Sequence, residues 1–414
     1  MCHRSMRTLF LPALLSAVGC VGTVDHSQPT AGAASPDEDP TETPTFLSAA
    51  FGDHLPGMTA DEITRFNEGE TEFATAETVA DGLGPVFNDT ACGNCHTTPS
   101  VGGNSSSVFV TRFGTTTFEL EFDPLERLGG SLIQVHGIGP AGNCNFVGEV
   151  VPPQATIVAH RRTTALFGLG LVDAVNESTF FFVADFEAAN FPDEAGFPNV
   201  GHDIKNNRDA AGRFGWKAQN PTLHQFAGDA YLNEMGITNP EFPNENCPQG
   251  NCALLACNPK PGLNDDGSGV TKFTDFMTFL APPPVPSRTL AAALGRAKFR
   301  EIGCNHCHWA SFKTGNNASA ALNQVTFHPF SDFMLHDMGS LGDGIEQGLA
   351  TGGFIKTAPL WGVHTLTKFL HDGRADSLEN AVLGHAGQAQ GARDRFAALS
   401  DQDRANIIAF LNSI

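Results

Sequence analysis

The chain has few basic residues and almost no tyrosine. Its 414 residues include 24 Lys and Arg against 45 Asp and Glu, a formal net charge of −21, and they include one Tyr against 33 Phe. A surface so poor in positive charge repels nucleic acids and anionic lipids, so neither is expected as a partner. The near absence of tyrosine leaves the chain with few oxidisable phenols.

Long apolar runs are also missing. No stretch approaches 18 consecutive apolar residues, so the sequence predicts no membrane-spanning helix. The remaining composition is that of a folded protein, with 41% hydrophobic and 17% charged residues. It excludes a disordered or collagen-like chain. The length is sufficient for two or three domains with cores of their own.

The first residues are a targeting segment. Arg4 and Arg7 precede a short apolar run, a pattern typical of a secretory signal. The run ends in the sequence AVGC at residues 17–20, which resembles a bacterial lipobox. We therefore expect residues 1–19 to be a lipoprotein signal peptide and Cys20 to carry the lipid. This places the mature protein in the bacterial cell envelope, anchored at the outer membrane and facing the periplasm. An ordinary cleaved signal is the alternative.

A polar segment follows the signal. Residues 20–45 are rich in Pro, Ser, Thr, Ala and acidic residues and contain almost no large apolar side chain. Such a segment cannot bury enough surface to fold on its own. We expect it to be a flexible linker between the lipid anchor and the folded body.

Two pentapeptides concentrate the chemistry of the chain. Residues 92–96 (CGNCH) and 304–308 (CNHCH) both have the C-x-x-C-H pattern of c-type haem attachment. Residues i, i+3 and i+4 of a helical turn share one face, so two thiols can bond to the haem vinyl groups while the histidine reaches the iron. The sequence thus predicts two covalently bound haem c groups, held by Cys92, Cys95, Cys304 and Cys307, with His96 and His308 as iron ligands.

Zinc sites and redox dithiols use similar cysteine pairs. A zinc site places two Cys/His clusters about 12–20 residues apart, whereas these two motifs lie near opposite ends of the chain. A redox dithiol needs one C-x-x-C and does not need a histidine after it. Both alternatives are therefore disfavoured.

Four further cysteines remain, at positions 144, 247, 252 and 257. An even remainder in an exported protein suggests two disulfides. Cys247 and Cys252 are close enough to form a small loop, but the pairing stays open at this point. The acidic, glycine-rich stretch 265–269 is a candidate calcium site, although it lacks the later bidentate acid of an EF-hand and a plain turn is favoured.

Helical patterns flank both motifs. Thr59 and Glu62 form a capping box before a polar helix that ends near Phe73. Residues 289–303 predict a helix whose apolar stripe holds Leu290, Leu294 and Ala297, and Ser400 opens a helix at the C-terminal end. One helix before the haem motif and one at the end of the domain are typical of cytochrome c.

The middle of the chain has a different pattern. Residues 107–113, 117–122 and 131–136 predict strands, and the proline-rich stretch 282–286 is the best domain boundary. We therefore expect a mainly α protein with two cytochrome c-type haem domains. The N-terminal haem c domain would span 46–282 with a large loop-rich insertion that contains some strands, and the C-terminal haem c domain would span 283–414.

Five blocks outside the haem motifs carry a family likeness. They are residues 161–171, 212–218, 335–339, 359–362 and 369–374. With them the chain resembles the bacterial di-haem oxidoreductases, also called di-haem peroxidases or thiol oxidoreductases. These are distant relatives of the di-haem cytochrome c peroxidases and of the methylamine-utilisation di-haem enzymes. The likeness covers most of residues 50–414 and implies two haem c domains and redox chemistry with peroxide.

The resemblance also concerns the sixth ligand of the second haem. In the peroxidase relatives, the block that matches Phe369–Arg374 carries a ligating Met immediately before its His. Here that position is Leu370, which cannot coordinate iron. Met338 is the first candidate for the ligand and His336 the alternative, unless both are packing residues or the haem is five-coordinate. A Met ligand would raise the potential of that haem.

By analogy with the family, the first haem is the peroxide site and the second transfers electrons. Cleavage of the O–O bond requires an acid or base over the distal face. The candidates are His136 and His160, followed by His202, His224, Glu119 and Glu149, although a structural role is commoner for any one histidine. Trp216 is the candidate electron relay, Trp361 is a second, and Trp309 must lie near the second haem because it follows His308.

These features predict an oxidoreductase that reduces hydrogen peroxide or another small oxidant. A small basic redox protein would suit the acidic surface as electron donor. The alternatives are a passive di-haem electron-transfer cytochrome, a di-haem oxygenase, and an enzyme that oxidises a side chain of a partner protein. The cytochrome would show no spectral change with peroxide, and the oxygenase would act without peroxide.

Overall fold

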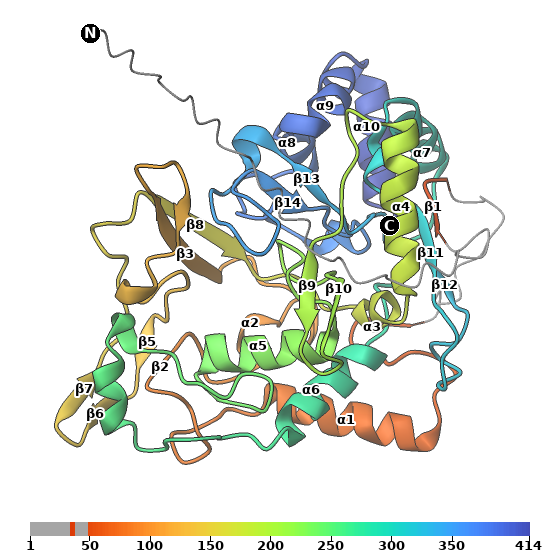
Figure 1. The fold of residues 1–414 in the computed structure, drawn as a ribbon. Coiled ribbons are helices and arrows are strands. Elements are labelled where there is room, and N and C mark those ends of the chain that lie inside the picture. The colour runs from red at the N-terminus through yellow and green to blue at the C-terminus, as the bar shows by residue number, and fades with distance from the viewer. Residues whose placement is uncertain (1–33, 38–48) are drawn as a thin grey trace, which may run out of the picture.

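The structure is a computed structural model that describes residues 34–37 and 49–414. The predicted signal peptide 1–19, the lipid-bearing Cys20 and most of the predicted linker 20–45 lie outside the described residues. In Figure 1, helices α1, α5 and α6 lie at the bottom, and α7 to α10 lie at the top. Small sheets and the helices α3 and α4 lie between or beside these two groups.

The first haem motif follows a helix that packs on a second helix far along the chain. α1 (Ala60–Ala74) begins with the predicted capping box, in which the Thr59 hydroxyl accepts from the Glu62 N–H and the Glu62 carboxylate accepts from the Thr59 N–H. α1 crosses α6 (Ser268–Phe279) at Gly69, where a Cβ atom would lie 2.3 Å from the Lys272 carbonyl oxygen. Only glycine permits so close an approach.

The second motif repeats this arrangement. α7 (Leu290–Glu301) precedes it and packs on α10 (Asp401–Leu411), which is capped by the Ser400 hydroxyl as predicted. The crossing is again made by a glycine, because a Cβ atom on Gly295 would lie 1.8 Å from the Asn406 carbonyl oxygen. The predicted apolar stripe of α7 is wrong, since Leu290 and Leu294 are 78% and 53% exposed, and the buried face is made by Ala292, Gly295 and Phe299.

The other helices are short or connect the two helix pairs, α1 with α6 and α7 with α10. α2 and the 3-10 turn η4 form the two haem motifs themselves, and α5 packs on α6 (Figure 1). Their bounds are α2 Cys92–Cys95, α3 Leu169–Asp173, α4 Glu177–Asn190, α5 Leu223–Met235, η4 Cys304–His306, α8 Leu378–Leu383 and α9 Gln390–Ala397.

Strands form six small sheets of two or three strands within the described ranges. The insertion contains β3 to β10, and its largest sheet has the antiparallel order β4-β3-β8, with Phe109 opposite Arg162 and Gly114 opposite Ile157. Residues 117–121, predicted as part of a strand, form a turn instead. Four strands lie after residue 282, where none was predicted. The bounds are β2 Val86–Phe87, β3 Phe109–Thr116, β4 Phe122–Asp123, β5 His136–Gly137, β6 Gly139–Ala141, β7 Cys144–Phe146, β8 Ile157–Arg162, β9 Val200–Asp203, β10 Arg208–Ala211, β11 Ser311–Lys313, β12 Thr326–Phe327, β13 Leu335–Asp337 and β14 Phe354–Lys356.

A piece of the predicted linker belongs to the folded body. β1 (Ala34–Ser35) pairs antiparallel with β11, with Ala34 opposite Phe312. Asp37 then accepts hydrogen bonds from Asn305, inside the second haem motif, and from Arg300, at 3.2 and 2.6 Å. The prediction of flexibility over 20–45 therefore fails for these residues, because strand pairing and an ion pair hold them.

The hydrophobic cores do not follow the predicted boundary at residue 282. The larger core joins α1, α5 and α6 to residues beyond that boundary, including the fully buried Trp309 and Phe312. The smaller core is formed by α7, α10 and their neighbours. Trp309 thus serves as a packing residue of the larger core, with its ring against Phe186.

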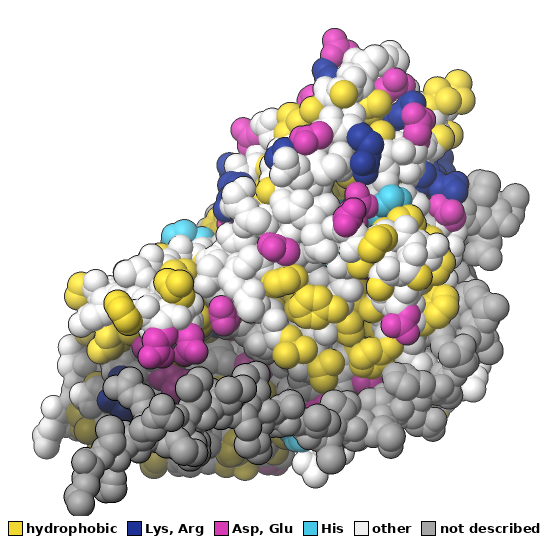
Figure 2. Space-filling view, turned by 45° about the horizontal axis from the view of Figure 1, so that its top comes forward, with side chains coloured by type: hydrophobic (Ala, Val, Ile, Leu, Met, Phe, Trp, Pro, Cys, Tyr) yellow, Lys and Arg dark blue, Asp and Glu magenta, His cyan; other side chains and the backbone are white. Residues whose placement is uncertain are grey.

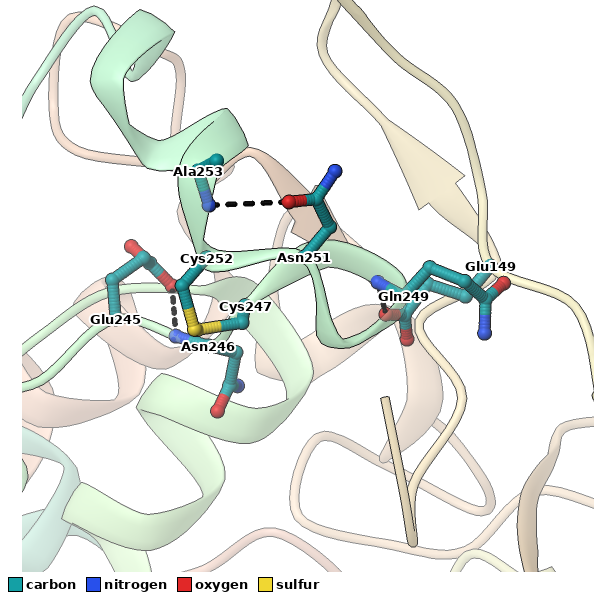
Figure 3. Close-up of a disulfide and its surroundings, with 8 residues drawn as sticks. All are labelled: Glu149, Glu245, Asn246, Cys247, Gln249, Asn251, Cys252 and Ala253. Carbon is teal, nitrogen blue, oxygen red and sulfur yellow. Dashed lines mark hydrogen bonds between the residues drawn. A yellow bond between two sulfur atoms is a disulfide. The ribbon is translucent and has the colours of Figure 1, made fainter. Parts of the chain in front are cut away.

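Two disulfides tie the insertion together, as the four remaining cysteines suggested. Cys144 of β7 is bonded to Cys257, and Cys247 is bonded to Cys252. Figure 3 shows the second bond beside Gln249, whose backbone N–H donates to the buried Glu149 carboxylate at 2.6 Å. The Cys144–Cys257 bond therefore holds the segment after α5 against β7, and the Cys247–Cys252 bond closes a small loop within that segment.

The surface carries charge of both signs despite the net negative charge. On the face shown in Figure 2, acidic side chains are scattered, and basic ones appear mostly in the upper part. Within the described ranges, no helix has the length and apolar content required to cross a bilayer.

Substituting Gly295 with Ala should destabilise the fold. The added methyl group meets the backbone of α10 rather than a flexible side chain, so the helices must separate, at a cost of about 1–3 kcal/mol in the free energy of unfolding. Denaturant unfolding of the purified protein measures this cost. The matched control is Leu294→Ala on the exposed face of α7. An equal effect of the two substitutions would show that the crossing at Gly295 is not tight.

Candidate haem sites

Both motifs present two unpaired thiols beside a buried histidine. Cys92, Cys95, Cys304 and Cys307 are the free cysteines of the described chain, whereas the four cysteines of the insertion are all in disulfides. The two thiols within each motif are thus not bonded to each other. At the second motif, Gly303 adopts a left-handed backbone (φ 82°) that ends α7 and turns the chain into η4.

The hydrogen bonds of the motif histidines point to iron ligation. His308 Nδ1 lies 2.9 Å from the Phe330 carbonyl oxygen, and His96 Nδ1 lies 3.0 Å from that of Gly103. A carbonyl oxygen only accepts, so Nδ1 carries the proton and Nε2 is left with its lone pair. A second-shell hydrogen bond of this kind orients a ligating imidazole in metalloproteins.

The thiols do not have the properties of a redox dithiol or a zinc site. Burial raises the pKa of Cys92, Cys95 and Cys304 to about 12, and it raises the pKa of Cys307 well above the usual range. Reactive cysteines have a lowered pKa and a partly exposed thiolate. Within the described residues, the one cluster with metal-ligand geometry joins Cys307 to Asp332 and His336 and includes no second cysteine.

A cavity of about 180 Å³, the large cavity, opens beside the second motif. Cys304, Cys307 and His308 line it on one side. Four further side chains that could ligate iron also line it, namely His336, Met338, His371 and His385. The site therefore offers an imidazole from the motif and several candidates for a second axial ligand.

His385 has the same hydrogen-bond arrangement as the motif histidines. Its Nδ1 lies 2.8 Å from the Ala381 carbonyl oxygen of α8, so Nε2 again keeps its lone pair. Burial lowers the pKa of His385 and lowers the pKa of His308 to about 4, and His385 adds to the effect on His308. The sequence reasoning missed this residue, and the signal for it was a histidine directly after the short helix α8.

The structure gives different surroundings to the two residues that the sequence predicts as a sixth iron ligand. Met338 lines the large cavity, as a ligand would. His336 also lines it, but its Nε2 is bonded to the Asp332 carboxylate at 2.9 Å and its Nδ1 faces the Cys307 sulfur at 3.7 Å. Both ring nitrogens of His336 are therefore engaged, which disfavours it as an iron ligand.

A second cavity, the small cavity of about 80 Å³, is lined by Asn104 and Thr164 but by no residue of the first motif. Thr164 lines it, and the Thr164 and Gly103 carbonyls partly offset the burial that lowers the pKa of His96 to about 4. No histidine or methionine is found among the described residues that line the small cavity. The two cavities meet at a shared wall that includes Arg162, Trp216 and Lys356.

The predicted distal acids and bases do not lie at either cavity. His136 is exposed with its ring 5.6 Å from that of Phe87, and His160 is exposed and hydrogen-bonded to Thr111. His202 pairs with Asp209 on the surface, and His224 pairs with Glu241 at 2.8 Å. These histidines are thus on surface strands or already paired, and a distal role for any of them stays a prediction.

The predicted carboxylates also have other roles. Glu119 is exposed in the turn after β3, and Glu149 is buried with its oxygens accepting from the Gln134 and Gln249 N–H groups. At the candidate calcium stretch, the Asp265 carboxylate accepts from the Gly269 and Val270 N–H groups at 2.9 and 3.3 Å. It caps α6, which is the plain-turn interpretation.

Trp216 is the residue that was predicted as an electron relay. It lines both cavities, its indole N–H donates to the Arg162 carbonyl at 3.0 Å, and its ring lies 6.1 Å from that of His371. Trp361 lines the small cavity only. Each motif thus has the donor set of a haem c, two thiols and an imidazole with a free Nε2, and the chain fits this cofactor at both places.

Comparison with known families agrees with this geometry. The family described as "Di-haem oxidoreductase, putative peroxidase" matches residues 150–414. The chain belongs to this family. In this di-haem oxidoreductase, the matched part includes the second haem motif, the large cavity and the wall that the two cavities share.

Solved structures with distant similarity are also known. Hydrazine synthase of Kuenenia stuttgartiensis is 12% identical with a TM-score of 0.40, covering 91% of this chain and 97% of that one. A MauG-like protein associated with microbial copper homeostasis is 14% identical, with a TM-score of 0.39 and coverages of 90% and 94%. The di-haem peroxidase BthA of Burkholderia thailandensis is 14% identical, with a TM-score of 0.30 and coverages of 69% and 93%. Curated proteins gave no match.

Removing one pair of motif thiols should remove one haem. The double variant Cys304→Ala with Cys307→Ala should carry a single covalent haem, because it lacks the two sulfur atoms that would form the thioether bonds to the second haem. Intact-protein mass spectrometry and the haemochrome spectrum count the haems. As a control, Cys247→Ala with Cys252→Ala should keep both. A native chain with no covalent haem, or an unchanged count in the first variant, would contradict the assignment.

Proposed function

We propose that this di-haem oxidoreductase reduces hydrogen peroxide in the periplasm with electrons passed between its two haems. The difference between the two cavities carries the proposal. His308, Met338 and His385 all line the large cavity, whereas no His or Met of the described residues lines the small cavity. One iron would then be closed by two protein ligands, and the other would keep a position open for peroxide.

The chain's own residues would divide the work accordingly. A haem iron, when bound, supplies one-electron redox chemistry and, with an open position, a binding place for a peroxide oxygen. His308 and His385, each oriented by a carbonyl, would hold the second haem in an electron-transfer state. His96 would hold the first, and the buried surroundings of Thr164 and Trp216 would exclude bulk water.

Trp216 would carry electrons between the sites. Its indole ring is fixed by the bond to Arg162 and lines both cavities. The overall reaction takes two electrons and two protons per peroxide and yields two waters. A small basic redox protein is the proposed donor, and the lipid on Cys20 would hold the enzyme at the cell envelope.

The sixth ligand can be tested by spin state. The ferric protein should show one low-spin haem with two histidine ligands, and His385→Ala should convert that signal to high spin because Nε2 of His385 is lost. Electron paramagnetic resonance measures both states. Met338→Leu is the matched control and should leave the low-spin signal unchanged. The reverse pattern would establish Met338 as the ligand.

Peroxide reactivity tests the function itself. One equivalent of peroxide should oxidise both haems of the fully reduced protein, because each haem gives one electron. Trp216→Phe should slow oxidation of the second haem by on the order of tenfold, equivalent to about 1.4 kcal/mol in the barrier. Stopped-flow absorbance follows both haems. If oxygen reacts as fast as peroxide, or neither haem responds, the oxygenase or the passive cytochrome is the better description.

A further inference from the structure

Two buried cations lie at the wall between the cavities without a carboxylate partner. Arg162 and Lys356 are each 9% exposed and line both cavities. Arg162 donates to the Leu370 carbonyl and lies over the Trp216 ring, and Lys356 lies over the Phe333 ring. Among the described residues, none forms an ion pair with either group.

The nearest candidate counter-ion is already engaged. Asp332 is the carboxylate whose charge acts on Lys356, but its oxygens accept from His336 and from the Met334 N–H. Burial accordingly lowers the pKa of Lys356 to about 8 and that of Arg162 to about 10. Burying a charge without a partner is costly, so the wall requires an anion that the polypeptide does not supply.

The side chain of His371 is a third group that supports a bound anion at this wall. His371 is 3% exposed and lines the large cavity, and its Nε2 has no hydrogen-bond partner. Backbone hydrogen bonds fix the group as a unit. The Arg162 N–H donates to the His371 carbonyl at 2.8 Å, and the Lys356 N–H donates to the Trp216 carbonyl at 2.9 Å. Two cations without a carboxylate partner and a buried imidazole nitrogen without a hydrogen-bond partner therefore line the same cavity.

We propose that Lys356 and Arg162 bind the carboxylate groups of the second haem. Haem carries its vinyl groups and its two propionates on opposite halves of the ring. The cysteines that take the vinyl groups line the large cavity but not the small one, whereas Arg162 and Lys356 line both. Arg162 and Lys356 would thus hold the haem carboxylates at the wall that Trp216 also lines. The inference rests on the di-haem assignment and not on the reaction with peroxide.

Removing the Lys356 charge tests the proposal. A cation beside the second haem stabilises its ferrous state, so Lys356→Met should lower the midpoint potential of that haem. The expected change is about tenfold in the reduction equilibrium, or about 59 mV for one electron. Lys356→Arg keeps the charge and should restore most of the potential. The exposed Lys368→Met makes the same charge change elsewhere and should have little effect.

A second measurement separates a direct contact from a general effect of charge or folding. The propionate bending band in resonance Raman spectra should shift in Lys356→Met and not in Lys368→Met. Haem content by mass is checked first, since a chain without haem would refute the assignment and not this inference alone. Unchanged potential and Raman band in a fully loaded Lys356→Met protein would overturn the proposal. So would a wild-type potential that changes with added acetate at constant ionic strength, which would mean a free anion fills the position.

Discussion

The hydrogen bond from an imidazole Nδ1 to a backbone carbonyl is the constraint on which both haem motifs depend. It fixes the tautomer and directs Nε2 toward the place where iron would bind. The carbonyl must itself be held, and the chain does this locally. Residues 331 and 332 donate backbone hydrogen bonds back to Trp309 and Cys307, so the loop that supplies the Phe330 carbonyl is tied to the motif it serves. The first motif does the same with Gly102, which donates to the His96 carbonyl.

Two similar helix pairs present two dissimilar sites. Each motif follows a helix that crosses a later helix at a glycine, but the later helix is α10 at one site and α6 at the other. The space around the motifs is then completed by different elements. At the second motif, the end of α8 brings a histidine to the large cavity, whereas the small cavity is lined by apolar, amide and cationic groups. The same attachment chemistry can thus serve two tasks.

The sequence predicted what depends on local spacing. The two C-x-x-C-H motifs, the capping box at Thr59 and the N-cap at Ser400 follow from residues close together in the chain, and the even number of remaining cysteines predicted two disulfides. The family likeness was equally readable. What the sequence did not show depends on three-dimensional packing. The α7 stripe was misassigned because a glycine makes the contact, and His136 and His160 were chosen without knowing that their strands face solvent. His385 was missed because a ligand from a distant element has no fixed spacing to its motif.

The pairing of β1 with β11 has a consequence for where this part of the protein can lie. Ala34 is seated on the strand that follows the second motif, and Asp37 contacts Asn305 within it. If Cys20 carries the lipid, as proposed, the segment that connects the lipid to the folded body runs from Cys20 to Ala34. A fully extended chain of this length reaches roughly 50 Å. Ala34, and with it the strand that it pairs with after the second motif, would then stay within that distance of the bilayer.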